Sequence, residues 1–531
     1  MTHTGRLVGA LGALFLAGQA ACPAAAQPAP RDTLRIVLVN DLGSIDPVAS
    51  TAAFVRNHGF MVYDQIMALD SAGVARPQMA ERHEASADGM THRFTLREGL
   101  AFHDGTPVRA ADAVASIRRW AARDVVGRAL AAATASMEVV DDRTFEIRLS
   151  RPFALVAEAL ARPTASALFV MPERIAQTPP TTQITDATGS GPFIFERAAW
   201  QPGNRAVYRR NPAYRPRSEA PDGLAGGKVA RVERIEWLNL PDPATAAAAL
   251  ARGEIDFWEQ PSGDVLPLLA RDRNIRLMPI NAAGSVIWLR VNHLHPPFND
   301  PRARQAVLRA ISQPDNLAAA GVREEDRVAF CAAYFLCGTP LESRAGSEGL
   351  ERPDPERARA LLRESGYDGR PVVFLNASDS PINNAVTLVM ADALRRAGFN
   401  MDVPSMDWAT VTQRRGRREA PNAGGWDMFV TVANVLDARD PLTNLYLASP
   451  CGEGGLPGWP CDQRLEDLRR SWWEEPDADR RRAILDQVQA QALRSLPYIN
   501  AGQFRTPAAM RANLDGVRAT IIPVFWGVEK R

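Results

Sequence analysis

Gly89–Trp120 has the sequence GMTHRFTLREGLAFHDGTPVRAADAVASIRRW. Thr91–Leu96 alternates apolar and polar residues, as a half-buried strand does. A glycine turn follows, and then His103-Asp104-Gly105, in which the Asp-Gly pair favours positive φ. The apolar spacing from Ala111 onward predicts a helix that ends near Trp120. The stretch therefore predicts a strand, two turns and a helix, and it contains no catalytic motif.

Length and composition predict an ordinary globular protein with several domains. At 531 residues the chain is too long for one hydrophobic core and should hold two or three domains. A hydrophobic content of 46% with 23% charged residues argues against wholesale disorder. The net charge of +1 gives no reason to expect nucleic acid as a partner, and we expect none.

The N-terminus predicts export. Arg6 precedes the apolar run Leu7–Ala20, and Ala24-Ala25-Ala26 offers a cleavage site of the A-x-A type. A membrane span needs about 20 apolar residues, more than this run supplies. A lipid anchor at Cys22 is disfavoured, because Gln19 stands where a lipoprotein site normally carries leucine. We therefore expect residues 1–26 to be a signal peptide, cleaved near Ala26, and the mature protein to reside in the periplasm.

The cysteines of the mature chain form two local groups, Cys331 with Cys337 and Cys451 with Cys461. In an oxidising compartment an even number of cysteines indicates disulfides. Four cysteines allow three pairings, of which we favour 331–337 and 451–461. Zinc sites would need closer cysteine pairs or interleaved histidines, so we expect no metal.

No catalytic constellation is found in the sequence. It has no phosphate-binding P-loop, no G-x-G-x-x-G after a strand and no H-E-x-x-H zinc helix. His103-Asp104 lies in a tight turn, where neighbouring side chains seldom point at one target. His293 and His295 alternate on a loop without a third ligand nearby. We expect no enzymatic activity and no cofactor.

Elsewhere, apolar patterns predict alternating strands and helices. Strands are expected at 34–39, 232–240, 287–292, 372–375 and 426–430, and a last one begins at 496–499. Helices are expected at about 52–68, 245–253, 384–398 and 480–495.

The stretch 89–120 resembles a signature of the family 5 solute-binding proteins of ABC transporters. Further segments resemble the family in the same order along the chain: Ser44-Ile45-Asp46-Pro47, Gly189–Phe193, Arg210–Tyr214, Gly253–Phe257, Pro296–Ala306 and Arg352–Gly366. The resemblance extends from Leu34 to about Gly516.

The resemblance implies an α/β fold of the type II periplasmic-binding-protein kind, with two lobes, a hinge and an inserted subdomain. The expected division is 27–75, 182–285 and 499–531 for lobe I, 76–181 for its inserted subdomain, and 286–498 for lobe II. It also implies a monomer that captures a peptide or another amine-bearing solute between the lobes and delivers it to a membrane permease. A periplasmic sensor or chaperone with the same fold is the alternative, and a secreted hydrolase is disfavoured by the missing catalytic groups.

The resemblance points to the loop Asn434–Pro441 for ligand binding. Asp437 falls where peptide receptors hold the ligand's ammonium group, and Asn434 and Asp440 belong to the same loop. A buried carboxylate is stable only when it is paired, so this reading predicts a cationic group on the ligand. The alternative is a surface loop with two solvated aspartates that pair with Arg439.

Other candidate ligand residues rest on similarity alone. Trp408 matches a tryptophan that walls the cleft of peptide receptors, with core packing as the alternative. Ser44, Thr51 and Asn292 are further cleft candidates. Dipeptide receptors carry an arginine at the place of Asn376–Pro381, where this chain has none, and this absence disfavours dipeptides. Asp379 would repel a carboxylate if it faced the cleft.

Overall fold

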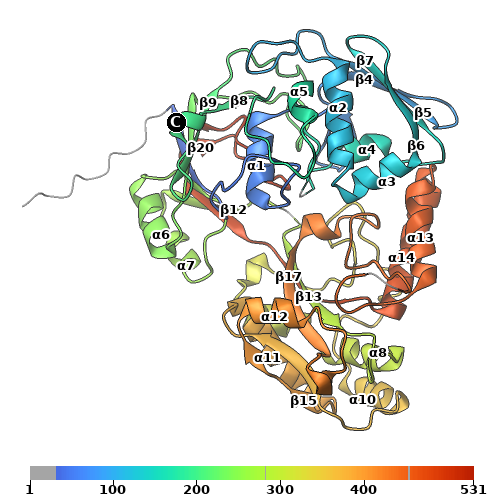
Figure 1. Cartoon of the computed structure of the whole chain (residues 1–531). Coiled ribbons are helices and arrows are strands. Elements are labelled where there is room, and N and C mark those ends of the chain that lie inside the picture. The colour runs from blue at the N-terminus through green and yellow to red at the C-terminus, as the bar shows by residue number, and fades with distance from the viewer. Residues whose placement is uncertain (1–31, 165, 282, 453–454) are drawn as a thin grey trace, which may run out of the picture.

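The computed structural model describes residues 32–531 apart from 165, 282 and 453–454, and for residues 435 and 437 it describes the backbone alone. The predicted signal peptide, residues 1–26 with Cys22, lies outside the described residues. Three sheets organise the rest, and Figure 1 shows them in two lobes.

The first sheet combines strands from both ends of the described chain. Its order is β12-β19-β11-β1-β10-β9-β8, in which β1 runs parallel to β10 and β11, whereas β19 is antiparallel to β11 and β12. The strands are β1 (Thr33–Val37), β8 (Phe193–Phe195), β9 (Arg205–Arg210), β10 (Arg234–Leu238), β11 (Phe257–Trp258), β12 (Ile275–Pro279) and β19 (Pro507–Arg511). Lys530 fixes the C-terminal end to this sheet through Asp256 Oδ1, at 2.9 Å.

The second sheet lies in the other lobe, at the bottom of Figure 1. Its order is β15-β14-β17-β13-β18, and β16 also pairs with β14. The strands are β13 (Ser285–Val291), β14 (Val372–Ala377), β15 (Met401–Asp402), β16 (Ser405–Met406), β17 (Met428–Asn434) and β18 (Ile499–Phe504). Strands β14 and β17 are parallel, so the chain must cross over between them, and helix α11 (Pro381–Arg396) lies in that connection.

The third sheet contains the strand of the Gly89–Trp120 stretch. It is antiparallel throughout, in the order β4-β5-β7-β6, with β4 (Ala80–Ala85), β5 (Thr91–Leu96), β6 (Thr134–Val139) and β7 (Thr144–Leu149). Two short pairs complete the strands: β2 (Met67–Leu69) with β3 (Ala75–Pro77), and β20 (Leu514–Asp515) with β21 (Glu529–Lys530). Strand β5 has the predicted bounds, and the predicted helix is α2 (Ala110–Ala121).

The remaining helices cover the sheets. Those associated with the first and third sheets are α1 (Ala53–Val62), α3 (Val125–Ala133), α4 (Val156–Ala161), α5 (Glu173–Ala176), α6 (Pro243–Arg252), α7 (Leu266–Leu269) and η1 (Arg197–Ala199). Later in the chain are α8 (Pro301–Ala310), α9 (Gln313–Ala319), α10 (Pro355–Glu364), α12 (Trp408–Arg414), α13 (Gln463–Glu474), α14 (Ala478–Ser495), η2 (Glu324–Asp326), η3 (Pro421–Ala423) and η4 (Val435–Ala438). Helix α1 ends at Val62, earlier than the predicted residue 68, because residues 67–69 form strand β2.

Three of these helices begin with Asp-Pro for one physical reason. The carboxylates of Asp242, Asp300 and Asp354 accept hydrogen bonds from backbone N–H groups in the first turns of α6, α8 and α10. Proline at the next position has a φ suited to a helix and lacks an N–H that would otherwise be unpaired. The dipeptide therefore fixes where each helix starts.

The chain passes between the first and second sheets at two places. It leaves after β12 and returns between β18 and β19, because β18 pairs with β13 whereas β19 pairs with β11 and β12. The return crossing therefore lies between Phe504 and Pro507. The expected domain boundaries, including the end of lobe II at residue 498, remain predictions.

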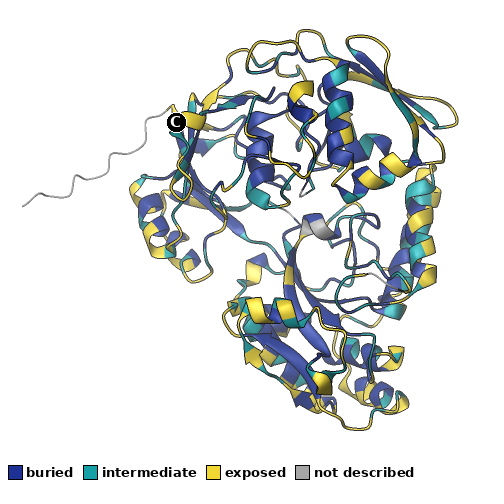
Figure 2. Cartoon of the chain, in the orientation of Figure 1, coloured by how far each residue is buried: buried dark blue, intermediate teal, exposed yellow. Residues whose placement is uncertain are grey.

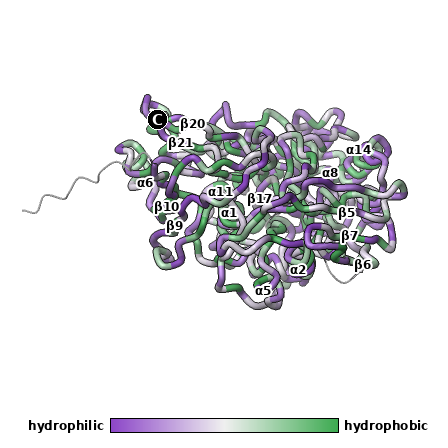
Figure 3. Tube along the Cα trace, turned by 90° about the horizontal axis from the view of Figure 1, so that it is seen from above, coloured by the Kyte–Doolittle hydropathy of each residue, from purple (hydrophilic) through white to green (hydrophobic). Residues whose placement is uncertain are grey.

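The largest core reaches across both lobes, because Val286 and Trp288 of β13 belong to it as well as the residues of the first sheet. Figure 2 shows the strands largely buried and the outer helix faces exposed. One large cluster packs around the first and third sheets and continues into α13 and α14, and another surrounds the second sheet. Figure 3 shows hydrophilic and hydrophobic residues interspersed along the trace, and within the described residues no helix combines the length and apolar character that a membrane span requires.

Candidate functional site

A cavity of about 340 Å³ lies between the two lobes. Segments 69–73, 155–163, 223–224 and 519–521 line it from one side. Segments 338–341 and 439–440, together with Trp472 and Arg481, line it from the other. Its volume is close to the lower end of the roughly 300–1,000 Å³ that small-molecule sites occupy. The cavity can therefore hold a small solute in contact with both lobes.

A buried ion pair crosses the wall of this cavity. Arg162 Nη1, just after helix α4, lies 2.7 Å from Asp440 Oδ2, and the two side chains are 5% and 2% exposed. The other oxygen of Asp440 accepts hydrogen bonds from the backbone N–H groups of Leu442 and Thr443. Burial alone would raise the pKa of Asp440, but Arg162 and the backbone N–H of Thr443 hold it below its usual value. Asp440 is therefore an ionised carboxylate that Arg162 neutralises.

A second carboxylate, Asp70, shapes the turn that faces this pair. Its Oδ2 lies 2.8 Å from Arg76 Nε, and its Oδ1 accepts the backbone N–H of Val74 at 2.8 Å. These contacts close the turn Ser71–Gly73, in which Gly73 has a φ of +79°, a conformation that suits glycine. Asp70 thus has a structural role, and its charge is paired.

Arg439 extends toward this turn from the second lobe. A Cβ placed on Gly73 would lie 3.1 Å from Arg439 Nη2, so a larger residue at 73 would press on the guanidinium. Arg439 forms no ion pair with any described residue. Burial, and then the nearby Arg162, lower the pKa of Arg439 to about 10, although Asp440 acts in the opposite direction. The site therefore contains a half-buried guanidinium without a carboxylate of its own.

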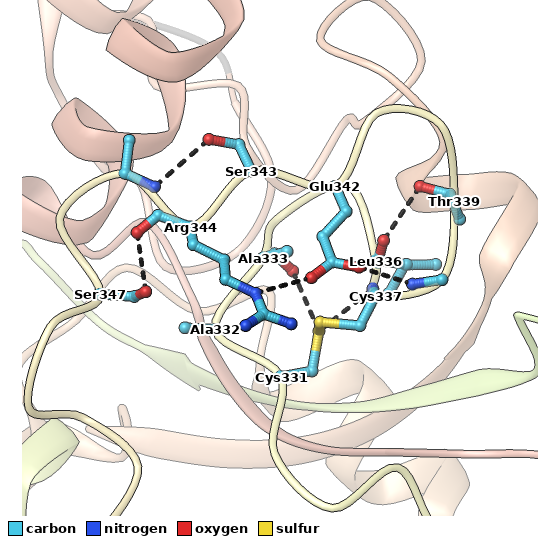
Figure 4. A network of polar contacts seen from close by, with 12 residues as sticks. Cys331, Ala332, Ala333, Leu336, Cys337, Thr339, Glu342, Ser343, Arg344 and Ser347 are labelled. Carbon is cyan, nitrogen blue, oxygen red and sulfur yellow. Dashed lines mark hydrogen bonds and ion pairs between the residues drawn. A yellow bond between two sulfur atoms is a disulfide. The ribbon is translucent and has the colours of Figure 1, made fainter.

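A disulfide loop forms another part of the cavity wall. Cys331 and Cys337 are bonded, as predicted, and residues 338–341 follow directly and line the cavity. Figure 4 shows the polar contacts that hold this loop. Thr339 Oγ1 donates to the carbonyl oxygen of Phe335 at 2.7 Å, and Glu342 accepts the backbone N–H of Gly338 at 2.9 Å. The covalent link and these hydrogen bonds together fix the position of the wall.

The second predicted disulfide is also present, and it lies away from the cavity. Cys451 and Cys461 are bonded, and both residues are exposed. Their loop contacts the second sheet, because the carbonyl oxygen of Pro457 accepts a hydrogen bond from Arg290 Nε at 2.6 Å. The local pairing of all four cysteines is therefore confirmed.

Comparison with known proteins identifies the family of this chain. The family described as "Bacterial extracellular solute-binding proteins, family 5 Middle" matches residues 75–455. This chain belongs to that family. Its members bind solutes, and the predicted solute-binding role and family are thus confirmed.

Full-length relatives agree with this family assignment. A protein of Sinorhizobium fredii, described as "Probable peptide ABC transporter periplasmic-binding protein y4tO", is 37% identical over 531 residues, which cover 97% of this chain and 98% of that protein. Among solved structures, the substrate-binding protein CtaP of Listeria monocytogenes has a TM-score of 0.77 at 17% identity, over 94% of this chain and 99% of CtaP. A dipeptide-binding protein of Pseudoalteromonas in complex with Met-Leu has a TM-score of 0.73 at 19% identity, over 94% and 100% of the two chains. The predicted two-lobed α/β fold is confirmed.

Of the ligand residues predicted from the family 5 resemblance, Asp440 lines the cavity. Asn434 ends β17 and is exposed, and its side chain accepts the backbone N–H of Leu436 at 3.1 Å. Asp437 lies in η4, and its side chain is outside what the structure describes. The predicted loop thus borders the cavity, and the role of Asp437 remains a prediction.

Trp408 lies outside the cavity lining, at the start of helix α12. It packs against a small core cluster of the second lobe, and the guanidinium of Arg415 lies 5.4 Å from its ring centre. Its backbone N–H donates to Asp379 Oδ1 at 2.8 Å. Asp379 therefore has a partner at this helix end and, like Trp408, does not contribute to the cavity wall.

The other similarity-based candidates are also outside the cavity lining. Thr51 is exposed, and the hydroxyl of Ser44 lies 3.4 Å from Gln183 Oε1. Asn292 is fully buried directly after β13, where its Nδ2 donates to the carbonyl oxygen of Trp426 at 2.9 Å and its Oδ1 accepts the backbone N–H of Leu294. Both ends of that amide are used within the protein, which favours a structural role.

Sequence reasoning missed the arginines of the cavity. No sequence motif indicates Arg162. Arg439 was considered only as a partner of the two solvated aspartates in the alternative interpretation of its loop. One signal was present, because Arg439 lies within the loop that the resemblance singled out. Among the described residues, no group of three or more His, Cys, Asp and Glu side chains could hold a metal ion.

Proposed function

We propose that this protein captures a short peptide, or another small solute that bears an amine, in the cavity between its lobes and delivers it to the membrane permease of an ABC importer. The observation that carries the proposal is the cavity of about 340 Å³ lined from both lobes. Its position supports a role in binding, because a ligand that contacts both lobes stabilises their closed arrangement. The name of the 37% identical relative supports a peptide as the ligand.

In this proposal the protein acts after export and has no catalytic activity of its own. Residues 1–26 would direct the chain to the periplasm, and the mature monomer would present its closed form to the permease. Lobe I would consist of residues 27–75, 182–285 and the C-terminal segment, with residues 76–181 inserted as a subdomain. Lobe II would consist of residues 286 to about 504. The two lobes would rotate relative to each other about the two chain crossings, one between β12 and β13 and the other between β18 and β19.

A thermal-shift screen of the purified mature protein tests the proposal. The panel contains peptides of two to five residues, amines, sugars and metal ions. A specific ligand at 100 times its dissociation constant should add about 2.7 kcal/mol to the free energy of unfolding. We expect peptides to raise the unfolding temperature, and a panel in which only non-amine solutes act would contradict the proposal.

Uptake measurements then separate transport from sensing. A strain without this gene should lose uptake of the radiolabelled ligand, and the plasmid-borne gene should restore it. Normal uptake in the deletion strain, with an altered response to the solute, would favour a sensor instead.

Asp437→Asn tests the predicted ammonium ligand. Removal of this charge should weaken an amine-bearing ligand by about 10-fold or more while the unfolding temperature without ligand is unchanged. Asp407→Asn, on the exposed N-cap of α12, is the matched control. Equal affinity of Asp437→Asn and wild type in calorimetry would exclude an ammonium contact at this position.

A further inference from the structure

The described charges that line the cavity do not all cancel in pairs. Asp70 is paired with Arg76, and Asp440 with Arg162. Three charged residues remain without an ion pair to a described residue: Glu158, Arg439 and Arg481. Arg481 directs Nη1 to the carbonyl oxygen of Glu475 at 2.9 Å. Two guanidinium groups and one carboxylate therefore remain available to a bound solute.

Arg439 is the member of this set with the greatest need for an anion. Its guanidinium lies against Gly73 of the opposite lobe, and Arg162, already paired with Asp440, is its cationic neighbour. Removing a charged group from water is costly unless an opposite charge compensates it. Asp440 attracts Arg439 electrostatically, but its ion pair is with Arg162, and one carboxylate cannot neutralise two guanidinium groups. An anion from outside the protein therefore fits this position.

We propose that Arg439 binds a carboxylate of the transported solute, the C-terminal carboxylate where the solute is a peptide. This inference rests on the proposed function and specifies its ligand class. The planar guanidinium can hold a carboxylate through two parallel hydrogen bonds.

The carboxylate contact would also favour closure of the lobes. Arg439 belongs to the second lobe and lies against the Ser71–Gly73 turn of the first. A carboxylate bound beside it would stabilise the arrangement in which these two segments are close, because only that arrangement offers both surfaces to the ligand. Arg439 lies elsewhere than the arginine that dipeptide receptors carry at the place of Asn376–Pro381, directly after β14. That segment does not line the cavity of this protein.

The test compares peptides as free acids and as C-terminal amides. Calorimetry on the mature protein measures trialanine, dialanine and any peptide found by thermal shift, each beside its amide. We expect the free acid to bind about 30-fold or more tightly than the amide. In Arg439→Gln the affinity for the free acid should fall by about the same factor, with no change for the amide. Arg118→Gln is the matched control and should behave as wild type, because this exposed arginine of α2 donates, among the described residues, to the backbone carbonyl of Met137 alone.

Each outcome supports or overturns the inference. Arg439→Gln should not lower the unfolding temperature without ligand, because the substitution removes an unpaired charge, whereas a purely structural arginine would lower it. Peptides that bind equally as acid and amide would overturn the inference and leave the proposed function standing. If neither a peptide nor another amine-bearing solute binds, the proposed function fails, and the same acid–amide comparison on sugar acids decides the role of Arg439.

Discussion

Two buried aspartate–arginine pairs use the same chemistry in different places. Asp46 and Arg119 lie 2.8 Å apart within the first lobe, and Asp440 and Arg162 lie 2.7 Å apart across the cavity wall. All four side chains are at most 5% exposed. The number of hydrogen bonds around each pair is what distinguishes them.

The Asp46–Arg119 pair is surrounded by hydrogen bonds. Arg119 contacts both oxygens of Asp46 and also donates to two backbone carbonyl oxygens, those of Thr178 and Thr182. Asp46 accepts three backbone N–H groups besides, from Val48, Ala49 and Ile184. By contrast, Arg162 Nε is buried and has no hydrogen-bond partner among the described residues. The first pair fixes a loop within one lobe, whereas the second joins segments that we propose separate during ligand entry.

The largest expected effect comes from Asp46→Ala. This change leaves the Arg119 guanidinium buried without its partner, and such losses typically cost about 3–5 kcal/mol of unfolding free energy. Urea unfolding, followed by circular dichroism, measures the difference. Ligand affinity at a temperature where the variant is folded should equal that of wild type. A loss below about 1 kcal/mol would show that the loop does not depend on this pair.

The two disulfides extend the comparison between scaffold and cavity. Replacement of either pair by serines should reduce the free energy of unfolding by about 2–3 kcal/mol, because both close short loops of similar length. Only Cys331→Ser/Cys337→Ser should also weaken ligand binding, since residues 338–341, which directly follow Cys337, form part of the cavity wall. Calorimetry on both double variants tests this difference, and an equal loss of affinity in the two would contradict it.

Asp440→Asn should have a smaller effect on stability and a clearer effect on binding. The change keeps the shape of the side chain but removes the charge that pairs Arg162 across the cavity. We expect the open arrangement to gain population and the ligand to bind about 10-fold more weakly, equivalent to about 1.4 kcal/mol. Asp46→Asn serves as control, because its pair lies within one lobe. If both variants bind ligand as wild type does, the Arg162–Asp440 pair does not contribute to closure.

The sequence predicted local features well because they depend on local physics. The alternation in Thr91–Leu96 gave the bounds of β5, and the short cysteine spacings gave both disulfides. Helix α13 was missed because its buried face, formed by Leu465, Arg469 and Trp472, includes a charged residue and so weakens the apolar period.

The cavity was harder to predict, because distant segments form it. Arg162 and Arg439 are brought together only by the tertiary fold. No local pattern indicates that Asp440 forms its ion pair with Arg162 and not with Arg439. Family resemblance pointed to a loop that borders the cavity, but it could not show that both polar atoms of the Asn292 amide form hydrogen bonds within the protein. The Ser44–Pro47 motif contributes Asp46 to the scaffold rather than a ligand contact, and Arg119 of the Gly89–Trp120 stretch is its partner.

Acid pH should produce the smallest effect that distinguishes the two aspartate–arginine pairs from ordinary carboxylates. Burial would raise the pKa of Asp46, but Arg119 and backbone N–H groups hold it below the ordinary value of 3.8 in the folded protein. The unfolded chain therefore takes up the proton first as pH falls. The contribution of Asp46 to stability is complete above pH 3.8 and is lost as pH falls through the lower pKa of the folded state. In urea unfolding between pH 6 and pH 2.5, the stability difference between wild type and Asp46→Asn should stay constant down to about pH 4 and then shrink. The pKa of Asp440 is lowered as well, so Asp440→Asn should follow the same course. A difference that grows below pH 4 would mean that neither carboxylate is held ionised by its arginine.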